Sequence, residues 1–436
     1  MSLSPAPSAG ARPAAAAHPV TDRVREALAV SLRGCDELLP VDDWTTKLAR
    51  SEATGVPLRV KLGLDPTAPD IHVGHTVVLN KMRQLQDLGH TVIFLIGDFT
   101  SMIGDPSGRN TTRPPLTREQ IEANAQTYYK QASLVLDPDR TEIRYNSEWS
   151  DPLGARGMIQ LAARYTVARI MEREDFKTRY QGGVSISVHE LLYPLMQGYD
   201  SVAMKADVEL GGTDQLFNLM VGRQLMKEYG LEPQCVITTP LLEGTDGHLE
   251  GGKLVGKKMS KSLGNYVGIQ EPPLEMVGKL MSIGDDLMWR YLDLLSTRKT
   301  AEIKQLQVDV AAGAVHPMAV KGSLAAELTG RYHGATVGQQ AVDEWMRIFS
   351  QREVPTDVPE VTVVAPNGAG IGIVQLLREA GLAESGGEAR RLVSQGAVHI
   401  DGAAVASLEL VVAIGGPLLL KVGKRRYARV TIGPPA

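Results

Sequence analysis

The sequence predicts an α/β fold: a Rossmann-like, doubly wound parallel sheet, followed by a helical domain and a small α+β domain. Three observations lead to this prediction. Apolar strand-like runs alternate with helical patterns from about 58 to 240, as in a parallel sheet with helices on both faces. From 272 to about 349 the pattern is helical only. A polar, Pro-containing stretch then precedes a short basic part.

These changes of pattern set the predicted boundaries. We expect a disordered tail at 1–20, because this stretch is rich in Ala and Pro and almost uncharged. Residues 21–53 begin the next part as an amphipathic helical lead-in. The predicted parts are a Rossmann-like domain at 21–270 with an inserted helical connecting element at about 155–190, a helical domain at 271–349, a linker at 350–360 and a C-terminal domain at 361–436.

The composition allows several cores and shows no global affinity for nucleic acid. The chain has 436 residues, of which 43% are hydrophobic, and a net charge of -4, so any RNA-binding surface must be local. Two cysteines, Cys35 and Cys235, are too few for a disulfide framework and suit a reducing cytosol. No stretch has the apolar length of a membrane span, so we expect a cytoplasmic protein without a membrane segment.

The chain is organised around residues 58–75. A strand-like alternation ends at Leu64, and a helical pattern starts at the level of His72, Gly74 and His75. Ligands of open parallel sheets bind just beyond the carboxyl ends of the strands, where these histidines are expected. Gly74 leaves space for a flat ring or a phosphate, and the helix start favours anions. A histidine here can equally be a cap or a surface residue, so this motif alone does not decide.

Polar groups also follow later strands. Residues 91–97 form a continuous apolar run that is typical of a central parallel strand, and Asp105 comes after it in a Gly-Asp-Pro turn. Such a turn is common without any function. The same order of strand, glycine turn and helix recurs further along the chain, at Gly212, Asp214 and Gln215. Both turns are therefore candidates for the same ligand-binding edge.

Residues 189–200 predict a helix with one polar face. Tyr193, Gln197 and Asp200 fall at i, i+4 and i+7, which is one side of a helix. A phenol, an amide and a carboxylate are costly to bury unless a polar ligand lies against them. A solvent-facing stripe is the alternative, but the rest of this helix is mostly apolar. We therefore expect these three side chains in a binding site.

A lysine-rich loop supplies the second signature. Residues 257–262 place Lys258, Lys261 and Ser262 in a glycine-rich segment. Lysine runs are usually solvated faces, whereas lysines alternating with hydroxyl residues on a mobile loop suit a triphosphate. The ordered pair HVGH and KMSKS resembles the signature of class I aminoacyl-tRNA synthetases.

The last part carries a local positive charge. From residue 365 onward there are eight basic and five acidic residues, a net charge of +3 on a remainder of -7. Binding of RNA phosphates requires a basic surface of this kind, although a charged surface used for oligomerisation is an alternative. The segment EARRLVSQGAVHIDGAAV resembles an RNA-binding domain shared by a ribosomal small-subunit protein and some pseudouridine synthases.

Together the motifs resemble the bacterial tyrosyl-tRNA synthetases over nearly all of residues 25–436. GLDPTAPDIHVGH, IGDPSGR, YPLMQGYD, GGTDQ and KMSKS occur in the order of that family. The resemblance implies ATP-dependent activation of L-tyrosine to tyrosyl-adenylate and transfer to the 3′ end of tRNA(Tyr), releasing pyrophosphate and AMP. It also implies ATP as substrate with Mg²⁺ that travels with the nucleotide, no metal ligands of the protein's own, and a homodimer with the region around 155–190 at the interface.

The resemblance assigns roles to the matching positions. It implies that the catalytic residues are His72, His75, Lys258 and Lys261. It implies an ATP site of Asp65, Gly74, His75, Gly212, Asp214, Lys258, Lys261 and Ser262. It implies a tyrosine site of Asp105, Tyr193, Gln197, Asp200 and Gln215, with Asp200 taking the phenol. The expected tRNA-binding residues are Arg390, Arg391, Lys424, Arg425 and Arg426.

One position departs from the pattern of the family. Many members have a pocket tyrosine where this chain has Lys61, and an ammonium cannot accept the proton of a phenol. This form looks like the second bacterial subgroup of the family. Lys61 could point away from the pocket, or it could pair with a carboxylate and hold it in place. We expect the first, because desolvation and repulsion from the substrate ammonium would both oppose a buried lysine close to the substrate. Asp200 is then expected to carry most of the discrimination, and Lys61→Ala to change it little.

Three other functions remain open at this point. Another nucleotidyltransferase of the H-x-G-H superfamily would normally be a small single domain without the polar helix face or the basic tail. Specificity of the tryptophanyl type would share the fold, but its substrate helix is not written YPLMQGYD. A non-catalytic RNA-binding paralogue should have lost signature histidines or lysines, and both sets are intact here.

Overall fold

A computed structural model of the chain describes residues 18–66, 71–106, 117–349, 358–366, 368–423 and 426–435. The chain divides into two compact units, 1–339 and 340–436. The predicted catalytic and helical parts fall in the first unit, apart from the last turns of one helix. Most of the predicted tail at 1–20 and of the predicted linker at 350–360 lies outside the described residues. The domain boundaries stay predictions.

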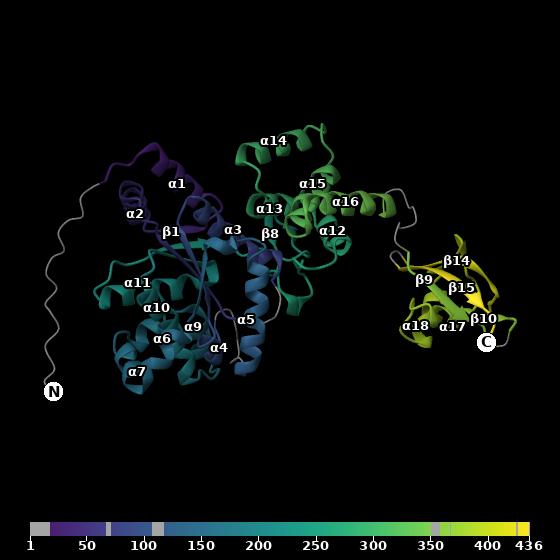
Figure 1. The fold of residues 1–436 in the computed structure, drawn as a ribbon, viewed down its shortest axis with the longest axis horizontal. Coiled ribbons are helices and arrows are strands. Elements are labelled where there is room, and N and C mark those ends of the chain that lie inside the picture. Colours follow the sequence, from purple (N-terminus) through teal and green to yellow (C-terminus); the bar gives the residue numbers. More distant parts are fainter. Residues whose placement is uncertain are drawn as a thin grey trace. The chain divides into compact units, whose positions relative to one another are not determined.

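The first unit contains a six-stranded sheet in the order β1-β6-β5-β2-β3-β4. Figure 1 labels its edge strand β1 in the N-terminal, purple part of the ribbon. All neighbours are parallel except β1, which runs antiparallel to β6. Its strands are β1 (Glu37–Leu39), β2 (Arg59–Leu64), β3 (Thr91–Ile96), β4 (Thr141–Tyr145), β5 (Val208–Gly212) and β6 (Cys235–Thr239). The chain proceeds outward from β2 to β4 and then returns to β5, so the strand order reverses between β2 and β5. The predicted doubly wound sheet is confirmed, and that reversal is where such sheets bind ligands.

Helices cover both faces of this sheet, which explains why its central strands are apolar throughout. In β3 every residue after Thr91 is buried. The helices next to the sheet are α1 (Asp22–Leu32), α2 (Val41–Thr54), α3 (Val73–Asp87), α4 (Thr100–Ile103), α5 (Arg118–Ala132), α6 (Ser147–Ser150), α10 (Tyr193–Met204) and α11 (Leu216–Glu228). Short 3₁₀ turns are η1 (Pro138–Arg140), η2 (Asp151–Leu153), η3 (Val188–Leu192), η4 (Thr213–Gln215) and η5 (Lys261–Leu263).

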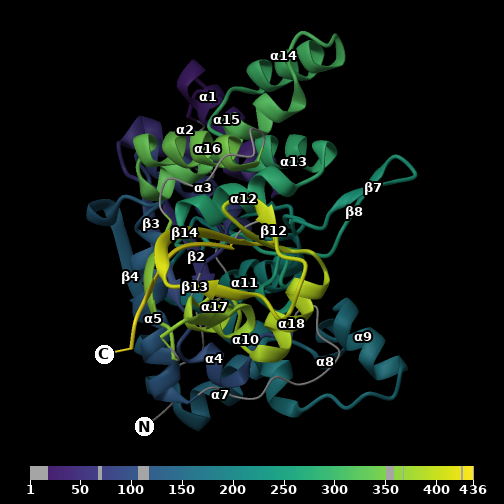
Figure 2. The same cartoon turned by 90° about the vertical axis from the view of Figure 1, so that its right-hand side faces the viewer.

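One expectation about local structure needs correction, and one hairpin was not expected. The helical lead-in at 21–53 is interrupted by β1, whose buried Leu38 pairs with Ile237 of β6. Three residues are too few to show a period, so this edge strand was missed. The glycine-rich segment before the lysine loop contains a hairpin, β7 (His248–Glu250) and β8 (Lys253–Val255). Gly251 and Gly252 form its turn with φ of 58° and 78°, and Figure 2 shows the hairpin projecting from the first unit.

The predicted connecting element is helical, with α7 (Gly154–Ala162), α8 (Val167–Ile170) and α9 (Glu174–Gln181). A buried ion pair of 2.6 Å between Arg179 and Glu190 ties its end to η3. The region after the lysine loop is also helical, as predicted. It consists of α12 (Pro273–Ser282), α13 (Asp285–Leu295), α14 (Thr300–Ala311), α15 (Pro317–His333) and α16 (Ala335–Phe349). None of the helices in the described ranges has the length and apolarity to cross a membrane.

The second unit is a small α+β structure with its own core. Its main sheet has the order β12-β11-β14-β15-β9, and β10 pairs with β13. Its elements are β9 (Glu360–Val364), β10 (Gly370–Gly372), α17 (Ile373–Glu379), α18 (Gly386–Ser394), β11 (Val398–Ile400), β12 (Ala403–Ala404), β13 (Val411–Ala413), β14 (Gly415–Val422) and β15 (Arg426–Gly433). Leu376 and Leu377 of α17 and Val398 of β11 are fully buried in this core.

Candidate active site

The histidine turn lies just beyond the carboxyl end of β2. His72 is the residue before α3 and His75 lies in the first turn of that helix, and their ring centroids are 3.8 Å apart. The turn is paired with the segment that follows the lysine loop, because Val73 N–H donates to the Val267 carbonyl and Ile269 N–H to that of Ile71. Backbone pairing therefore places the two predicted signatures side by side.

Burial and nearby lysines keep both imidazoles neutral. Burial, together with the charges of His75, Lys261 and Lys258, lowers the pKa of His72 to about 2. Burial, and to a smaller extent the charges of Lys261 and Lys258, lower the pKa of His75 to about 4. His72 N–H donates to Nδ1 of His75 over 3.2 Å, which assigns the ring hydrogen of His75 to Nε2. The histidines are therefore uncharged hydrogen-bonding groups beside two cationic side chains.

Gly74 is required where the two signatures meet. A Cβ at this position would lie 2.9 Å from Nδ1 of His72 and 3.3 Å from Cβ of Met259 in the lysine loop. Within the described ranges, Nδ1 of His72 is buried and has no hydrogen-bond partner. A side chain at position 74 would therefore push the loop or the histidine away, and the predicted close approach at Gly74 has a steric reason.

The lysine loop is anchored by a residue that the sequence analysis missed. Asn265 accepts a hydrogen bond from Ser260 N–H over 2.8 Å and donates to Asp246 over 2.9 Å. Its position directly after the KMSKSLG run was the available signal. The hydroxyl groups of Ser260 and Ser262 lie 3.0 Å apart. These bonds fix the backbone, while the lysine ammonium groups extend beyond it.

The lysine loop meets the turn after β5. Nζ of Lys258 lies 3.2 Å from Oδ2 of Asp214, and its side chain is about half exposed. A Cβ at Gly212 would lie 2.7 Å from Oδ1 of Asp214, so the glycine permits this position of the carboxylate. Lys261 Nζ lies 5.7 Å from the ring centre of Tyr266. The structure thus brings together the predicted catalytic residues and the predicted glycine turn.

Helix α10 presents the three predicted polar side chains. Tyr193 donates its hydroxyl proton to Oδ2 of Asp65 over 2.9 Å, and Oδ1 of Asp65 accepts from Thr100 over 2.7 Å. Burial, with the charges of Asp65 and Asp105, raises the pKa of Tyr193 well above its usual value. In the part of the chain that the structure describes, Oε1 of Gln197 is buried without a hydrogen-bond partner. An unsatisfied buried acceptor at this place indicates a donor on a ligand.

Asp200 is buried at the far end of this helix face, with 2% of its surface exposed. Oδ1 accepts from the Trp149 indole over 2.8 Å and Oδ2 from the Asn146 amide over 3.4 Å. Burial raises the pKa of Asp200 to about 7, although Lys61 and these two donors lower it. Sequence reasoning missed both donors. Asn146 directly follows β4, as Asp65 follows β2, so the same strand-end argument could have found it.

Asp105 and Gln215, which are both predicted to bind tyrosine, belong to one hydrogen-bond network. Gln215 Nε2 donates to Oδ2 of Asp105 over 2.9 Å, and Gln215 Oε1 accepts from Asn218. Arg173, from the connecting element, lies 3.4 Å from Oδ1 of Asp105 and bonds to Asn218. Arg173 was also missed, because it lies in a segment rich in both charge signs.

Lys61 pairs with a carboxylate, which is the alternative that was not preferred from the sequence. Its side chain is fully buried, and its ammonium forms a 2.7 Å ion pair with Glu209 of β5. It also donates to the Gln197 carbonyl over 3.2 Å and to the Ser201 hydroxyl over 2.9 Å, both on α10. The ion pair and the two hydrogen bonds offset the desolvation cost on which the expectation rested. Lys61 therefore lies beneath the helix that carries the predicted recognition groups.

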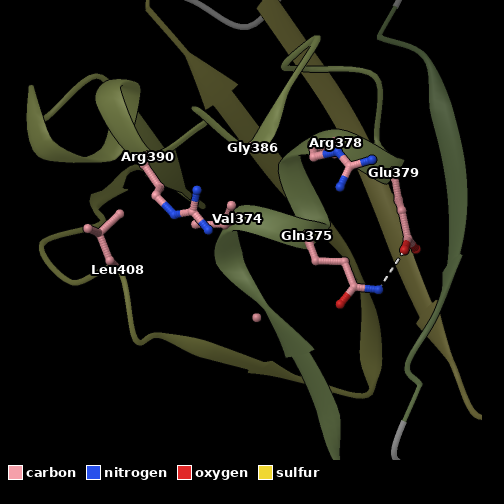
Figure 3. A pocket seen from close by; sticks show the side chains of 8 residues that line it. Val374, Gln375, Arg378, Glu379, Gly386, Arg390 and Leu408 are labelled. Atoms are coloured by element: carbon pink, nitrogen blue, oxygen red, sulfur yellow. Dashed lines mark hydrogen bonds between the residues drawn. The ribbon is translucent and has the colours of Figure 1, made fainter. Parts of the chain in front are cut away.

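In the second unit, Arg390 and Arg391 lie exposed on α18. Arg426 forms a 3.0 Å ion pair with Glu388 and donates to the Leu382 carbonyl. Lys424 and Arg425 lie outside the described residues. A cavity of about 410 Å³ is lined by Gly372, Val374, Gln375, Arg378, Glu379, Gly386, Arg390 and Leu408. Figure 3 shows the side chains of Arg378 and Arg390 at this cavity, with Gln375 bonded to Glu379.

Comparison with known proteins agrees with this geometry. The family "tRNA synthetases class I (W and Y)" matches residues 53–350, and the "Tyrosine--tRNA ligase SYY-like C-terminal domain" matches residues 351–430. The chain is 64% identical over 421 residues to a tyrosine--tRNA ligase of Cupriavidus pinatubonensis, covering 96% of this chain and 98% of the relative. It is 63% identical over 414 residues to one of Bordetella pertussis, covering 95% and 98%.

Solved structures show the same fold at low sequence identity. A C-terminally truncated mitochondrial tyrosyl-tRNA synthetase of Aspergillus nidulans aligns with a TM-score of 0.60 at 20% identity, over 76% of this chain and 95% of that one. A tyrosyl-tRNA synthetase of Archaeoglobus fulgidus complexed with L-tyrosine aligns with a TM-score of 0.57 at 22% identity, over 73% and 99%. From its motifs, its site and these matches, the chain belongs to the class I tRNA synthetases, in the family of the bacterial tyrosine--tRNA ligases.

Proposed function

We propose that the protein joins L-tyrosine to ATP, giving tyrosyl-adenylate and pyrophosphate, and then transfers the tyrosyl group to the 3′ end of tRNA(Tyr), releasing AMP. The observation that carries the proposal is the arrangement at one edge of the sheet. Neutral histidines and lysines lie on one side of the switch point, and a helix with a buried carboxylate lies on the other. The first set suits phosphates and the second suits a phenol.

In the first step, a carboxylate oxygen of tyrosine attacks the α-phosphorus of ATP, and the bond to pyrophosphate breaks. Negative charge grows on the phosphate oxygens, so catalysis is chiefly positioning and electrostatic stabilisation. Nε2–H of His75 is an available donor, and the Lys258 and Lys261 ammonium groups would close over the phosphates. Lys258 would exchange its contact with Asp214 for a phosphate oxygen, which frees Asp214 for the ribose.

Mg²⁺ would enter with ATP, because this ion is usually held by substrate phosphates and one or two carboxylates. Groups of three or more His, Cys, Asp or Glu side chains that could hold a metal ion are absent from the described residues. Ser262 and Gly74 would complete the nucleotide site.

The two cysteines, Cys35 and Cys235, are free thiols, which is consistent with a cytoplasmic protein.

For the amino acid, Asp200 would accept the phenol proton at the closed end of the pocket. Asp105, Tyr193 and Gln197 would bind the ammonium group, and the unpartnered Oε1 of Gln197 supports this role. Gln215 would align Asp105. Pyrophosphate exchange across tyrosine, phenylalanine and tryptophan tests the assignment. Tyrosine should give by far the highest rate, whereas a preference for tryptophan or exchange without any amino acid would contradict it.

For tRNA, the second unit would contact phosphates through exposed arginines such as Arg390 and Arg391. Deleting residues from about 356 onward should leave tyrosine activation intact and abolish charging of tRNA. The double change Arg390→Ala/Arg391→Ala should weaken tRNA binding and reduce its dependence on salt, because fewer counterions are released. Truncated protein that charged tRNA at the full rate would contradict this role.

We also propose a homodimer through the connecting element. Leu161 and Ile170 are buried within it, but Ile159 and Val188 are 71% and 78% exposed. Val167 and Tyr180 are also largely exposed, so this part of the surface carries several large apolar groups. Sedimentation should give a dimer at micromolar concentration. Ile159→Asp should shift it toward monomer, and an active wild-type monomer would count against the proposal.

A further inference from the structure

Two oppositely charged side chains are buried beneath α10, outside the groups that the proposed chemistry uses. Lys61 of β2 and Glu209 of β5 are register partners on adjacent parallel strands, with 0% and 1% of their side chains exposed. Their charged atoms lie 2.7 Å apart. These two strands flank the point where strand order reverses. Charges so deeply buried are costly unless each is paired and hydrogen-bonded.

The bonds of this pair reach one turn of α10. Besides its ion pair with Glu209, the Lys61 ammonium donates to the Gln197 carbonyl and to the Ser201 hydroxyl. The Ser201 hydroxyl in turn donates to Oε2 of Glu209 over 3.1 Å. Both ends of the turn from 197 to 201 are thus attached to the sheet by charged groups. Hydrogen bonds to charged groups are stronger than neutral ones, so the turn is firmly fixed.

The other side of the network is closed by α11. Gln234 donates to Oε2 of Glu209 over 2.5 Å and to the Leu219 carbonyl over 3.1 Å. A Cβ at Gly222 would lie 2.8 Å from Nε2 of Gln234 and 3.3 Å from Oε2 of Glu209. A glycine is therefore needed where α11 passes the pair. Gln234 and Gly222 together accommodate the buried carboxylate of Glu209.

The fixed turn carries two of the proposed tyrosine-binding residues. Gln197 is held through its backbone, and its side-chain oxygen is the buried acceptor without a partner in the described chain. Asp200 precedes Ser201 directly. The charge of Lys61 opposes the effect of burial on the pKa of Asp200, whereas Glu209, the weakest of the contributions, raises it. The pair therefore influences both the place and the charge of the phenol acceptor.

We propose that the Lys61–Glu209 pair is a positioning element for tyrosine recognition. It fixes the turn of α10 that presents Gln197 and Asp200 to the substrate. Lys61 takes the sequence position of a pocket tyrosine without contacting the substrate itself. This inference rests on the proposed activation of tyrosine.

The test uses the full-length protein and three variants: Lys61→Met, Glu209→Gln and the double change. Lys61→Met leaves Glu209 as an uncompensated buried charge and should lower the thermal midpoint. Adding Glu209→Gln should restore much of that midpoint, because the uncompensated charge is gone. The KM for tyrosine in pyrophosphate exchange should nevertheless stay raised by about tenfold or more in the double variant. The KM for ATP should change little.

The pH profile separates positioning from simple folding. In the double variant the pH midpoint of tyrosine binding should lie above that of wild type, because the main favourable charge near Asp200 is lost. Lys47→Met is a matched control. Lys47 is also buried, at 2% exposure, but its ammonium bonds to Asp207 and Pro233. This control should lower the thermal midpoint and leave the KM for tyrosine and the pH midpoint unchanged.

A double variant with the KM and pH midpoint of wild type would overturn the inference, because the pair would then contribute only to folding. Equal effects of Lys47→Met on tyrosine binding would do the same. If Lys61→Met does not fold, the double variant carries the comparison. Wild-type protein that fails to exchange pyrophosphate with tyrosine would instead refute the proposed function. The two failures are therefore distinguishable.

Discussion

The two sides of the site differ in how far their polar groups are satisfied before any substrate binds. On the nucleotide side, Nδ1 of His72 lacks a partner within the described ranges, and Lys258 is about half exposed on a loop. On the amino-acid side, Asp200 accepts from two side chains, and Asp65 holds both Tyr193 and Thr100. The nucleotide side has few internal bonds, whereas the amino-acid side is a dense buried network in which the Gln197 side-chain oxygen has no partner within the described ranges.

This difference matches the work that each side is proposed to do. Charge appears on the phosphates only during the reaction, so groups there contribute most if they are free to engage the transition state. Discrimination between amino acids depends on a rigid acceptor that is costly to leave unpaired. The comparison teaches that the nucleotide side should set rates and the amino-acid side should set affinities. Each prediction below tests one part of that division.

The largest effect should come from the nucleotide side. His72→Ala and Lys261→Ala should each slow adenylate formation by about 10²–10³-fold, because each removes a donor to the charge that develops on the phosphates. Tyrosine affinity should stay close to that of wild type. Single-turnover kinetics at saturating tyrosine and ATP measures the rate. Lys257→Ala is the matched control, since this neighbouring lysine is exposed and has no proposed role, and it should change the rate little.

The amino-acid side should give a smaller and different effect. Asp200→Asn should lower the preference for tyrosine over phenylalanine by about 10- to 100-fold, because the phenol loses a charged acceptor. The amide oxygen can still accept the short bond from Trp149, and only the longer bond from Asn146 is lost, so the pocket should stay folded. Competition between the two amino acids in pyrophosphate exchange measures the ratio. An unchanged ratio would remove Asp200 from the recognition site.

The two sides should also differ in their response to pH. The pKa of Asp200 is raised to about 7, so its carboxyl gains a proton as the pH falls below that value. Tyrosine affinity should then weaken by up to about tenfold per pH unit between pH 7 and 5. Since the folded state retains a proton that the unfolded chain releases near pH 4, the stability contributed by this group is lost as the pH rises through 7.

The nucleotide side should show no histidine titration over the same range. The pKa of His72 is lowered to about 2 and that of His75 to about 4, so neither free imidazole gains a proton between pH 6 and 8. The value of kcat/KM for ATP, measured at saturating Mg²⁺, should therefore lack an inflection near 6.5. A clear inflection there would mean that a charged histidine takes part.

The smallest effect should come from the anchor of the lysine loop. Asn265→Ala removes bonds to Ser260 and Asp246 and should slow adenylate formation by about three- to tenfold, the value of one or two ordinary hydrogen bonds. Tyrosine affinity should be unchanged. The same single-turnover experiment applies. A loss as large as that of Lys261→Ala would show that the loop has no defined position without this anchor.

Sequence patterns predicted the nucleotide side better than the amino-acid side. His72, His75, Lys258 and Lys261 are each encoded within a few residues, so their spacing alone places them on a helix start and a loop. The doubly wound sheet followed from period and length. Short β1 was missed because three residues carry no period, and Asn265 because its role depends on backbone that folds back onto it.

The amino-acid side depends on contacts between distant segments. Lys61 and Glu209 become neighbours only through the pairing of β2 with β5, which no local pattern reveals. Arg173 reaches Asp105 from the connecting element. Without Glu209 in view, burial of Lys61 is judged costly, so the sequence alone favours a lysine that points away over one that is paired with a carboxylate. Buried charge pairs of this kind need the sheet order before they can be inferred.

Calorimetric titration of L-tyrosine in the absence of ATP tests the division most directly, because only the amino-acid side can then contribute. The account predicts that His72→Ala binds tyrosine with the affinity of wild type and that Asp200→Asn binds it about tenfold or more weakly. Equal losses of affinity in both variants, or an unchanged affinity in Asp200→Asn, would contradict the account.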